Sequence, residues 1–338
     1  MKALIPIILL AFVVSVSGCV NAPFLQGIFG PTQPAVEQTP DLLIFAEKGV
    51  SPSPPIGTDS DFTAWTNLKS QAEPGSEPIK NAIVTVYDSG VCTIKKDQWQ
   101  PSDWTCKDDS LPCNHTFTDF SPKQVERLEF VMKAPSSGTI GGLETDCRVA
   151  YYVSYNSTAV STDDFDIISS ERLKEIQRTG EKPSWTDQPQ YVGIGPVKIY
   201  FEWKTPGPVE ENKNMVFSVR VVDKGTGTFE RVENQSFILK LPKDWNTTDG
   251  VTFEEICQSK DFSRTFCGGK FKAFANDTNY VFLNNTSPLN LISKETPEIV
   301  CTFVAPEIGV PEKTYQIEAR LNYTYKLYDE QVVHIVPR

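Results

Sequence analysis

Short segments in which hydrophobic and polar residues alternate dominate the chain from position 41 onward. These segments are rich in Val, Ile, Tyr, Phe and Thr, and they are separated by Pro, Gly, Asn and Asp. Successive side chains of a strand point to opposite faces, so this alternation predicts strands with one buried face and one solvated face. Such strands are typical of antiparallel β-sandwiches. The pattern therefore predicts an all-β fold.

Two segments have helical spacing instead. Residues 169–178 predict one short helix, with Ser170 as its N-cap and Gly180 as the residue that ends it. Residues 181–190 are polar and contain proline, which predicts a linker. One or two further helical turns are expected at 253–260.

The strand patterns occur twice, in the same order. In one pair of segments both members end in Asp-X-Gly, which predicts a turn, because Asp caps its own backbone and Gly accepts a positive φ. The corresponding segments are 41–47 with 197–203, 82–90 with 217–225, 128–135 with 299–306, 147–155 with 315–323, and 165–168 with 333–336. The repeat predicts two domains of similar architecture.

A proline-rich entry, a V-X-V strand and an Asp-X-Gly turn resemble the immunoglobulin-like modules of archaeal secreted and lipid-anchored proteins, including the cell-adhesion-related type called CARDB. That type has Asn where this chain has Asp88 and Asp223. The resemblance implies two tandem immunoglobulin-like antiparallel β-sandwiches, at 41–168 and 192–338, joined by a short helix and linker at 169–191. It assigns no catalytic or ligand-binding residue to this chain.

The N-terminal residues 1–18 combine a positive start with an apolar run at 3–16, as in secretory signal peptides. A run of about 14 apolar residues is shorter than the roughly 20 that span a bilayer. The sequence Val-Ser-Gly-Cys that ends at Cys19 resembles the lipobox of prokaryotic lipoproteins, which implies cleavage before Cys19 and a lipid on its thiol. Residues 19–40 then form a proline-containing tether. The alternatives are an uncleaved N-terminal helix in the membrane and a signal peptide that is cut at another position.

Eight asparagines stand in Asn-X-Ser/Thr, the acceptor sequence for N-glycans, which is more than the Ser and Thr content explains by chance. They are Asn114, Asn156, Asn234, Asn246, Asn276, Asn284, Asn285 and Asn322. Asn156, where a strand meets its turn, and Asn322, between two inward residues, are the best candidates. Together with the lipobox, these sequons favour an archaeal envelope and a place on the outer face of the cytoplasmic membrane or the cell surface.

The eight cysteines also fit an oxidising compartment. Cys19 is assigned to the lipid. Four cysteines of the first half are expected to pair among themselves in two disulfides, with the pairing open: Cys92, Cys106, Cys113 and Cys147. In the second half, Cys257 and Cys267 are expected to form a disulfide and Cys301 to stay a buried thiol. A bridge from Cys301 to one of the other two is the alternative.

Catalytic chemistry is hard to assemble from this sequence, and we expect no enzyme. The histidines are His115, expected in a loop, and His334, expected in the last strand, and neither belongs to a known nucleophile–base motif. Acidic clusters at 59–61, 108–109 and 163–166 have oxygen ligands for Ca²⁺ but lack the spacing of a known calcium loop. We therefore expect no metal and no cofactor.

Two tryptophans are candidate contacts with a partner. Trp99 and Trp104 flank Pro101 outside the repeated strands, and an exposed Trp stacks on sugars or anchors a protein interface. The alternative is that they fill the base of long loops tied by disulfides. The net charge of −11 argues against nucleic acid, because phosphate binding needs a basic surface. The expected partners are a protein or glycan of the envelope, and the membrane through the N-terminal lipid or helix.

These features predict a non-enzymatic, lipid-anchored cell-envelope glycoprotein that presents two immunoglobulin-like domains for adhesion, scaffolding or surface-layer association. The alternative is a polysaccharide-active enzyme or a carbohydrate-binding accessory protein at the cell surface. A deep cleft with two facing carboxylates would favour the enzyme.

Overall fold

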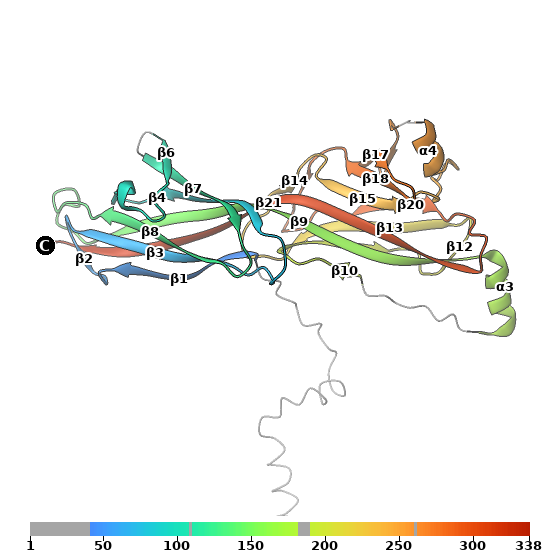
Figure 1. Ribbon diagram of the computed structural model, residues 1–338, viewed down its shortest axis with the longest axis horizontal. Helices are drawn as coiled ribbons and strands as arrows, with labels where there is room; N and C mark the ends of the chain where they lie inside the picture. Colours follow the sequence, from blue (N-terminus) through green and yellow to red (C-terminus); the bar gives the residue numbers. More distant parts are fainter. Residues whose placement is uncertain (1–40, 108–109, 182–189, 260–261) are drawn as a thin grey trace, which may run out of the picture. The chain divides into compact units, whose positions relative to one another are not determined.

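The computed structural model describes residues 41–107, 110–181, 190–259 and 262–338 (Figure 1). The described residues are mostly β-strand, in antiparallel sheets, so the expectation of an all-β fold is confirmed. The predicted signal peptide, Cys19 and the tether lie outside the described residues.

The strands and helices of the described chain have the following bounds. The first half contains β1 (Leu43–Ser51), β2 (Ile56–Gly57), β3 (Asp61–Ser70), β4 (Ile79–Asp88), β5 (Thr93–Ile94), a 3₁₀ turn (Lys96–Gln98), β6 (Thr105–Lys107), β7 (Ser110–Phe120), β8 (Val125–Lys133) and β9 (Thr145–Ile168). Helix α3 (Ser170–Thr179) follows. The second half contains β10 (Tyr191–Val192), β11 (Val197–Trp203), β12 (Val209–Glu210), β13 (Asn214–Asp223), β14 (Arg231–Val232), β15 (Phe237–Pro242), α4 (Phe253–Ser259), β16 (Thr265–Phe266), β17 (Phe271–Asn276), β18 (Tyr280–Asn285), β19 (Leu289–Asn290), β20 (Ile299–Val304) and β21 (Glu312–Val336).

One large sheet runs through both halves of the described chain, in the order β16-β17-β18-β15-β21-β9-β4-β7-β6. The short strands β10 and β12 pair with β9, and β2 pairs with β21. A smaller sheet, β1-β3-β8-β5, belongs to the first half, and another, β11-β13-β20, belongs to the second. The arrangement is β-sandwich-like, because buried side chains of the small sheets and of the large sheet join one hydrophobic core.

The centre of the large sheet is a ladder between β9 and β21. The two strands pair antiparallel from Thr145 opposite Ile335 to Ile168 opposite Glu312 (Figure 1). Segments that the sequence pattern predicts as four separate strands are therefore two long ones. Strand β21 pairs with β15 of the second half near its start and with β2 of the first half at its end. A single strand of the second half therefore takes part in the sheet beside both halves. The division into tandem domains at 41–168 and 192–338 stays a prediction.

The repeat is visible in the sheets, but one of its expected correspondences is wrong. The order β1-β3-β8 in the first half matches β11-β13-β20 in the second. Strand β13 is therefore equivalent to β3, whereas β4 lies in the large sheet beside β9. Segments 82–90 and 217–225 look alike because any half-buried strand that ends in Asp-X-Gly gives the same pattern.

The Asp-X-Gly turns themselves form as expected. Asp88 accepts a hydrogen bond from the Gly90 amide at 2.9 Å, and Asp223 accepts one from the Gly225 amide at 3.0 Å. Gly90 has a φ of 57°, the left-handed conformation that glycine adopts without strain. Gly225 is required for a different reason, because Tyr325 and Asp41 lie too close to it to leave room for a side chain.

Both predicted helices are present among the described residues. The N-cap of α3 is Ser169 rather than Ser170: its hydroxyl accepts a hydrogen bond from the Arg172 amide at 3.2 Å, and its backbone is extended. Gly180 ends the helix in the left-handed conformation, as expected. No helix in the described part of the chain is long and apolar enough to cross a membrane.

Three disulfides form within the described residues. Cys92–Cys147 and Cys106–Cys113 confirm that the first four cysteines pair among themselves. The expected Cys257–Cys267 bond is wrong, because Cys267 bonds to Cys301 and Cys257 is a buried free thiol. Cys301 is buried on β20, as expected. Its partner Cys267 directly follows β16, whereas Cys257 belongs to helix α4. These disulfides indicate an extracellular or secreted protein.

Candidate functional site

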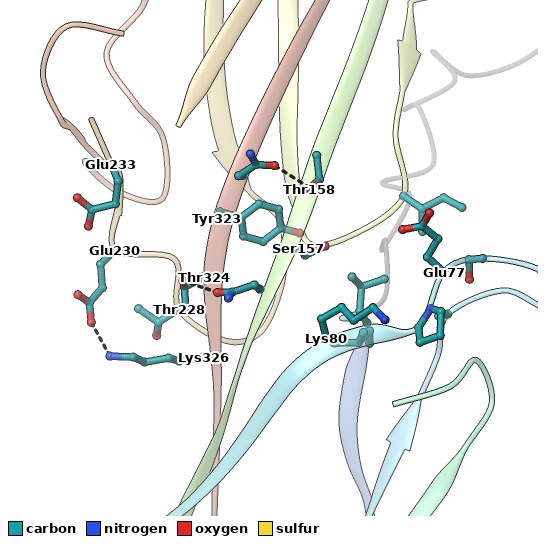
Figure 2. A pocket seen from close by; sticks show the side chains of 18 of the residues that line it. Glu77, Lys80, Ser157, Thr158, Thr228, Glu230, Glu233, Tyr323, Thr324 and Lys326 are labelled. Atoms are coloured by element: carbon teal, nitrogen blue, oxygen red, sulfur yellow. Dashed lines mark hydrogen bonds and ion pairs between the residues drawn. The ribbon is translucent and has the colours of Figure 1, made fainter. Parts of the chain in front are cut away.

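An open groove of about 800 Å³ crosses the middle of the β9/β21 ladder (Figure 2). One wall is the segment 72–80, which leads into β4, and the other is the segment 228–233, which contains β14. The floor between them is formed by residues 156–158 of β9 and by residues 322–324 and Lys326 of β21. We call this feature the central groove.

The floor of the central groove is made by two N-glycosylation sequons that face each other. Asn156 lies opposite Thr324, and Thr158 lies opposite Asn322. The Thr324 hydroxyl donates to Asn156 Oδ1 and the Thr158 hydroxyl donates to Asn322 Oδ1, each at 2.8 Å (Figure 2). Both bonds use the amide oxygen, so Nδ2, the atom to which an N-glycan attaches, takes no part in them.

Charged side chains stand at the rim of the groove. Figure 2 shows Glu77 and Lys80 on one side of the ladder and Glu230 with Lys326 on the other. Lys326 Nζ lies 3.5 Å from Glu230, and Lys80 Nζ lies 2.6 Å from Asp119. The cations are thus balanced by neighbouring carboxylates. A groove of this kind presents solvated hydroxyls, amides and ion pairs.

A buried cluster of carboxylates and phenols ties the start of the described chain to the loop after β13. Asp41 accepts hydrogen bonds from the backbone amide and the hydroxyl of Thr226. The Tyr325 hydroxyl donates to Asp223 at 3.3 Å, and burial raises the pKa of Asp223 above its usual range. A Cβ on Gly225 would lie 2.0 Å from the Tyr325 hydroxyl and 2.3 Å from Asp41 Oδ1. Every member is therefore engaged in holding the fold together.

Three tyrosines form a contact row across adjacent strands of the large sheet. Tyr152 on β9 lies directly opposite Tyr328 on β21, with ring centroids 5.3 Å apart, and Tyr87 on β4 lies 5.8 Å from Tyr152. Tyr328 is 46% exposed and Tyr87 40%. Lys326 Nζ lies 6.0 Å from the Tyr152 ring. We call Tyr87, Tyr152 and Tyr328 the tyrosine row.

Trp99 and Trp104 are not exposed anchors, and that prediction is wrong. Trp99 is 0% exposed and Trp104 8%. Their rings meet edge to face at 5.2 Å, both contact Phe130, and Trp99 Nε1 donates to the Val131 carbonyl at 2.9 Å. The segment between β5 and β7 folds back over the core, so its tryptophans fill that core rather than a partner's pocket.

The two histidines have structural surroundings. His115 is buried on β7, where it packs against Trp104 and Phe117, and its Nδ1 lies 2.8 Å from Asp103 Oδ1. Burial lowers the pKa of His115 below its usual range, although Asp103 opposes the shift. His334 is exposed on β21 and pairs with Asp146 at 3.0 Å. The expectation that His115 lies in a loop is wrong.

Among the predicted glycosylation sites, Asn285 is excluded. It is 0% exposed, its Nδ2 donates to the carbonyls of Glu233 and Ser287, and its Oδ1 accepts from the Phe237 amide. A glycan would have to displace these bonds inside the core. The remaining sequons are exposed at Asn114, Asn156, Asn234, Asn276 and Asn322 and half-buried at Asn246 and Asn284, and they stay predictions.

The acidic clusters are engaged by neighbouring side chains. Trp203 Nε1 donates to Asp163 at 2.9 Å, Gln316 donates to Asp164 and the Thr314 hydroxyl donates to Asp166. Asp61 and Asp59 pair with Lys95 and Lys133, and residues 108–109 lie outside the described chain. Within the described residues, no three metal-ligating side chains of the Asp, Glu, His or Cys type come together.

No protein-family model matches the chain, and no curated protein matches it. Among solved structures, it is similar to "pT26-6p" at 9% identity and a TM-score of 0.19, over 89% of this chain and 67% of that one. It is also similar to the C-terminal domain of the AgI/II polypeptide BspA of Streptococcus agalactiae, at 8% identity and a TM-score of 0.16, over 86% of this chain and 99% of that one. Likenesses this weak define neither a family nor a fold.

Proposed function

We propose that this chain is a non-enzymatic, lipid-anchored cell-envelope glycoprotein that presents two immunoglobulin-like, CARDB-like domains for adhesion, scaffolding or surface-layer association. The β9/β21 ladder is the observation that carries this proposal. All 24 residues of β9 pair with β21, which corresponds to a ladder about 80 Å long. Bending it at the centre would break backbone hydrogen bonds of two long strands, so the ladder suits a part that holds binding surfaces at a fixed spacing.

The proposed location rests on three features. The disulfides indicate an extracellular or secreted protein, the lipobox at Cys19 supplies an anchor, and exposed sequons such as Asn156 and Asn322 supply glycan sites. A lipid anchor and sequons together favour an archaeal envelope.

The surface proposed to meet a partner is the tyrosine row with the adjoining central groove. It replaces Trp99 and Trp104, which are buried. The rings of Tyr87 and Tyr328 are exposed, and exposed tyrosines are enriched at binding interfaces because each joins an apolar ring to a polar hydroxyl. The partner is a protein or a glycan of the envelope.

The row also favours a second candidate function, that of a carbohydrate-binding accessory protein. Exposed tyrosine rings beside threonine hydroxyls and asparagine amides are suited to sugars, which present both C–H faces and hydroxyls. The enzyme alternative is tested by incubating the purified protein with envelope polysaccharides. Reproducible hydrolysis would overturn the non-enzymatic proposal.

The direct test is crosslinking in native envelopes. Wild type, a Tyr87→Ser/Tyr328→Ser double variant and a Tyr280→Ser control are expressed at matched folding stability, and their crosslinked partners are compared. Tyr280 is half-buried on β18, away from the row. We expect the double variant to lose partners that wild type and the control keep. An identical partner set in all three would refute the proposed surface.

A further inference from the structure

The tyrosine row and the sequon at Asn156 lie on the same outward face of β9. Tyr152, Ser154 and Asn156 are alternate residues of this strand, so their side chains leave the sheet in one direction. Opposite them on β21 lie Tyr328, Lys326 and Thr324. The face therefore passes from the sequon, over one polar rung, to a rung of two tyrosines.

The spacing favours Asn156 over the second sequon of the groove. At about 3.4 Å per residue, Asn156 stands roughly 14 Å from Tyr152 along β9, whereas Asn322 stands roughly 20 Å from Tyr328 along β21. A glycan on Asn156 that turns toward the row first crosses Ser154 and Lys326. Their hydroxyl and ammonium groups are hydrogen-bond donors for sugar hydroxyls.

We propose that the tyrosine row is the docking surface for the protein's own glycan, attached at Asn156. This inference rests on the glycoprotein part of the proposed function and deepens it. The bond is the ordinary N-glycosidic one at Nδ2, which the hydrogen bond between Asn156 Oδ1 and the Thr324 hydroxyl leaves free. The tyrosine rings receive the C–H faces of the sugars that follow.

The charge of the row fits a neutral glycan. Lys326 is balanced by Glu230, and Arg148, two rungs beyond Tyr152, is paired with Glu330. The chain as a whole carries −11, which repels a polyanion. An uncharged chain of sugars meets no such repulsion.

The covalent link favours the attached glycan over a free one as the ligand of the tyrosine row. An open row of three rings encloses a sugar on one side only, so its affinity for a free sugar is weak. A ligand tethered by a short flexible link has an effective concentration in the millimolar range, which populates a weak site without any free ligand. A tethered concentration about three times the Kd leaves the rings uncovered about a quarter of the time, a roughly fourfold protection.

The test is hydroxyl-radical footprinting of the glycoprotein from its native host, with glycopeptide mapping of Asn156. Two variants remove this sequon through different residues, Asn156→Gln and Thr158→Ala. Asn322→Gln, which removes the other sequon of the groove, is the matched control, and the ring of Tyr280 on β18 is the internal reference. We expect Tyr152 and Tyr328 to be oxidised about fourfold more slowly in wild type and in the control than in the two Asn156-sequon variants.

The possible results distinguish a failure of the glycan docking from a failure of the glycoprotein proposal. Oxidation rates that are equal in all forms, with Asn156 glycosylated, would overturn the docking and leave the glycoprotein proposal intact. An unmodified Asn156 beside other glycosylated sequons would overturn the docking alone, and a chain without any glycan would overturn both. Protection of Asn156→Gln by added glycans released from the protein, at micromolar concentration, would mean that the row binds free sugars and would overturn the argument from attachment. A dimer whose dissociation exposes the row would identify a second copy as the occupant instead.

Discussion

Replacing Trp99 by alanine should destabilise the fold strongly while removing no partner contact. The Trp99 side chain is fully buried, packs edge to face on Trp104 and Phe130, and donates from Nε1 to the Val131 carbonyl. Removing a buried Trp or Phe side chain typically costs about 3–5 kcal/mol of unfolding free energy. The Val131 carbonyl loses one of its two donors and keeps the Lys95 amide at 3.0 Å, so we expect a loss within this range, about 3–5 kcal/mol.

The assay is urea unfolding of the oxidised protein, followed by far-UV circular dichroism. Trp99→Phe restores an aromatic ring but not the donor, so it should cost less, about 1–3 kcal/mol. Trp65→Ala is the matched control, because Trp65 is only half-buried and lies under Arg127 at 4.2 Å on the outside of β3. It should cost less than Trp99→Ala.

A loss below about 1 kcal/mol for Trp99→Ala, or a loss no larger than that of Trp65→Ala, would refute the placement of Trp99 in the core. That result would indicate that the Trp99 side chain is exposed, as the sequence predicts. An unchanged slope of unfolding free energy against urea is needed for the comparison, since a changed slope signals a different unfolded or native state.

Three further predictions concern the turn, the buried histidine and the cysteines. Gly225→Ala should lower the free energy of unfolding by about 1–3 kcal/mol, because the new Cβ would overlap the Tyr325 hydroxyl and the Asp41 carboxylate. In the control Gly138→Ala the new Cβ has no atom closer than 3.9 Å, so the change should stay within about 0.5 kcal/mol. Equal shifts of the melting temperature in the two variants would contradict this prediction. Burial lowers the pKa of His115, so the unfolded chain takes up a proton near its ordinary pKa of about 6.5 while the folded chain resists. The contribution of His115 to stability should therefore fall as the pH drops below about 7.5 and through the ordinary pKa, until the folded chain also takes up the proton. His334, whose pKa is raised by Asp146, acts in the opposite direction, so the comparison is between wild type and His115→Phe: the variant should lose less stability on acidification, and an identical pH slope argues against the prediction. Cys267→Ser should cost about 2–4 kcal/mol. In wild type, alkylation of the unfolded but unreduced protein should label Cys257 and no other cysteine of the described residues; a linked peptide containing Cys257 would show a different pairing.

Strand positions and their inward faces could be predicted from the sequence. The alternation in 82–86 and 217–221 places Ala82, Val84 and Val86, and likewise Phe217, Val219 and Val221, in the core, and all six are fully buried. The prediction of inward positions succeeds because one face of a half-buried strand contacts the core and the other contacts water. Hydrophobic and polar residues therefore alternate along the strand, and this alternation can be read from a short stretch of sequence.

Strand pairing could not be predicted in the same way. The pattern of 147–155 and of 165–168 says nothing about whether they form one strand, and only the partner β21 shows that they do. The error at Cys257 has the same origin. Which cysteine meets Cys301 depends on how α4 and β16 pack on β20, and this is information about distant elements rather than local spacing.

The candidate site was missed because its members are ordinary strand residues. Tyr87, Tyr152 and Tyr328 come from three segments, and their contact follows from register alone. The position of Trp99 and Trp104 outside the repeated strands predicts exposed side chains, but a loop that packs over a core buries its largest side chains. The pairing of the sequons at Asn156 and Asn322 also follows from register.

Intact-protein mass spectrometry of the protein purified from the membrane fraction of its native host tests the proposed function most directly. We expect a chain that begins at Cys19, carries lipid on that residue and has additional hexose-type mass on exposed sequons, Asn156 among them. Cys19→Ser should then appear in the medium rather than in the membranes. A chain with the bare polypeptide mass, recovered from the cytosol, would contradict the account.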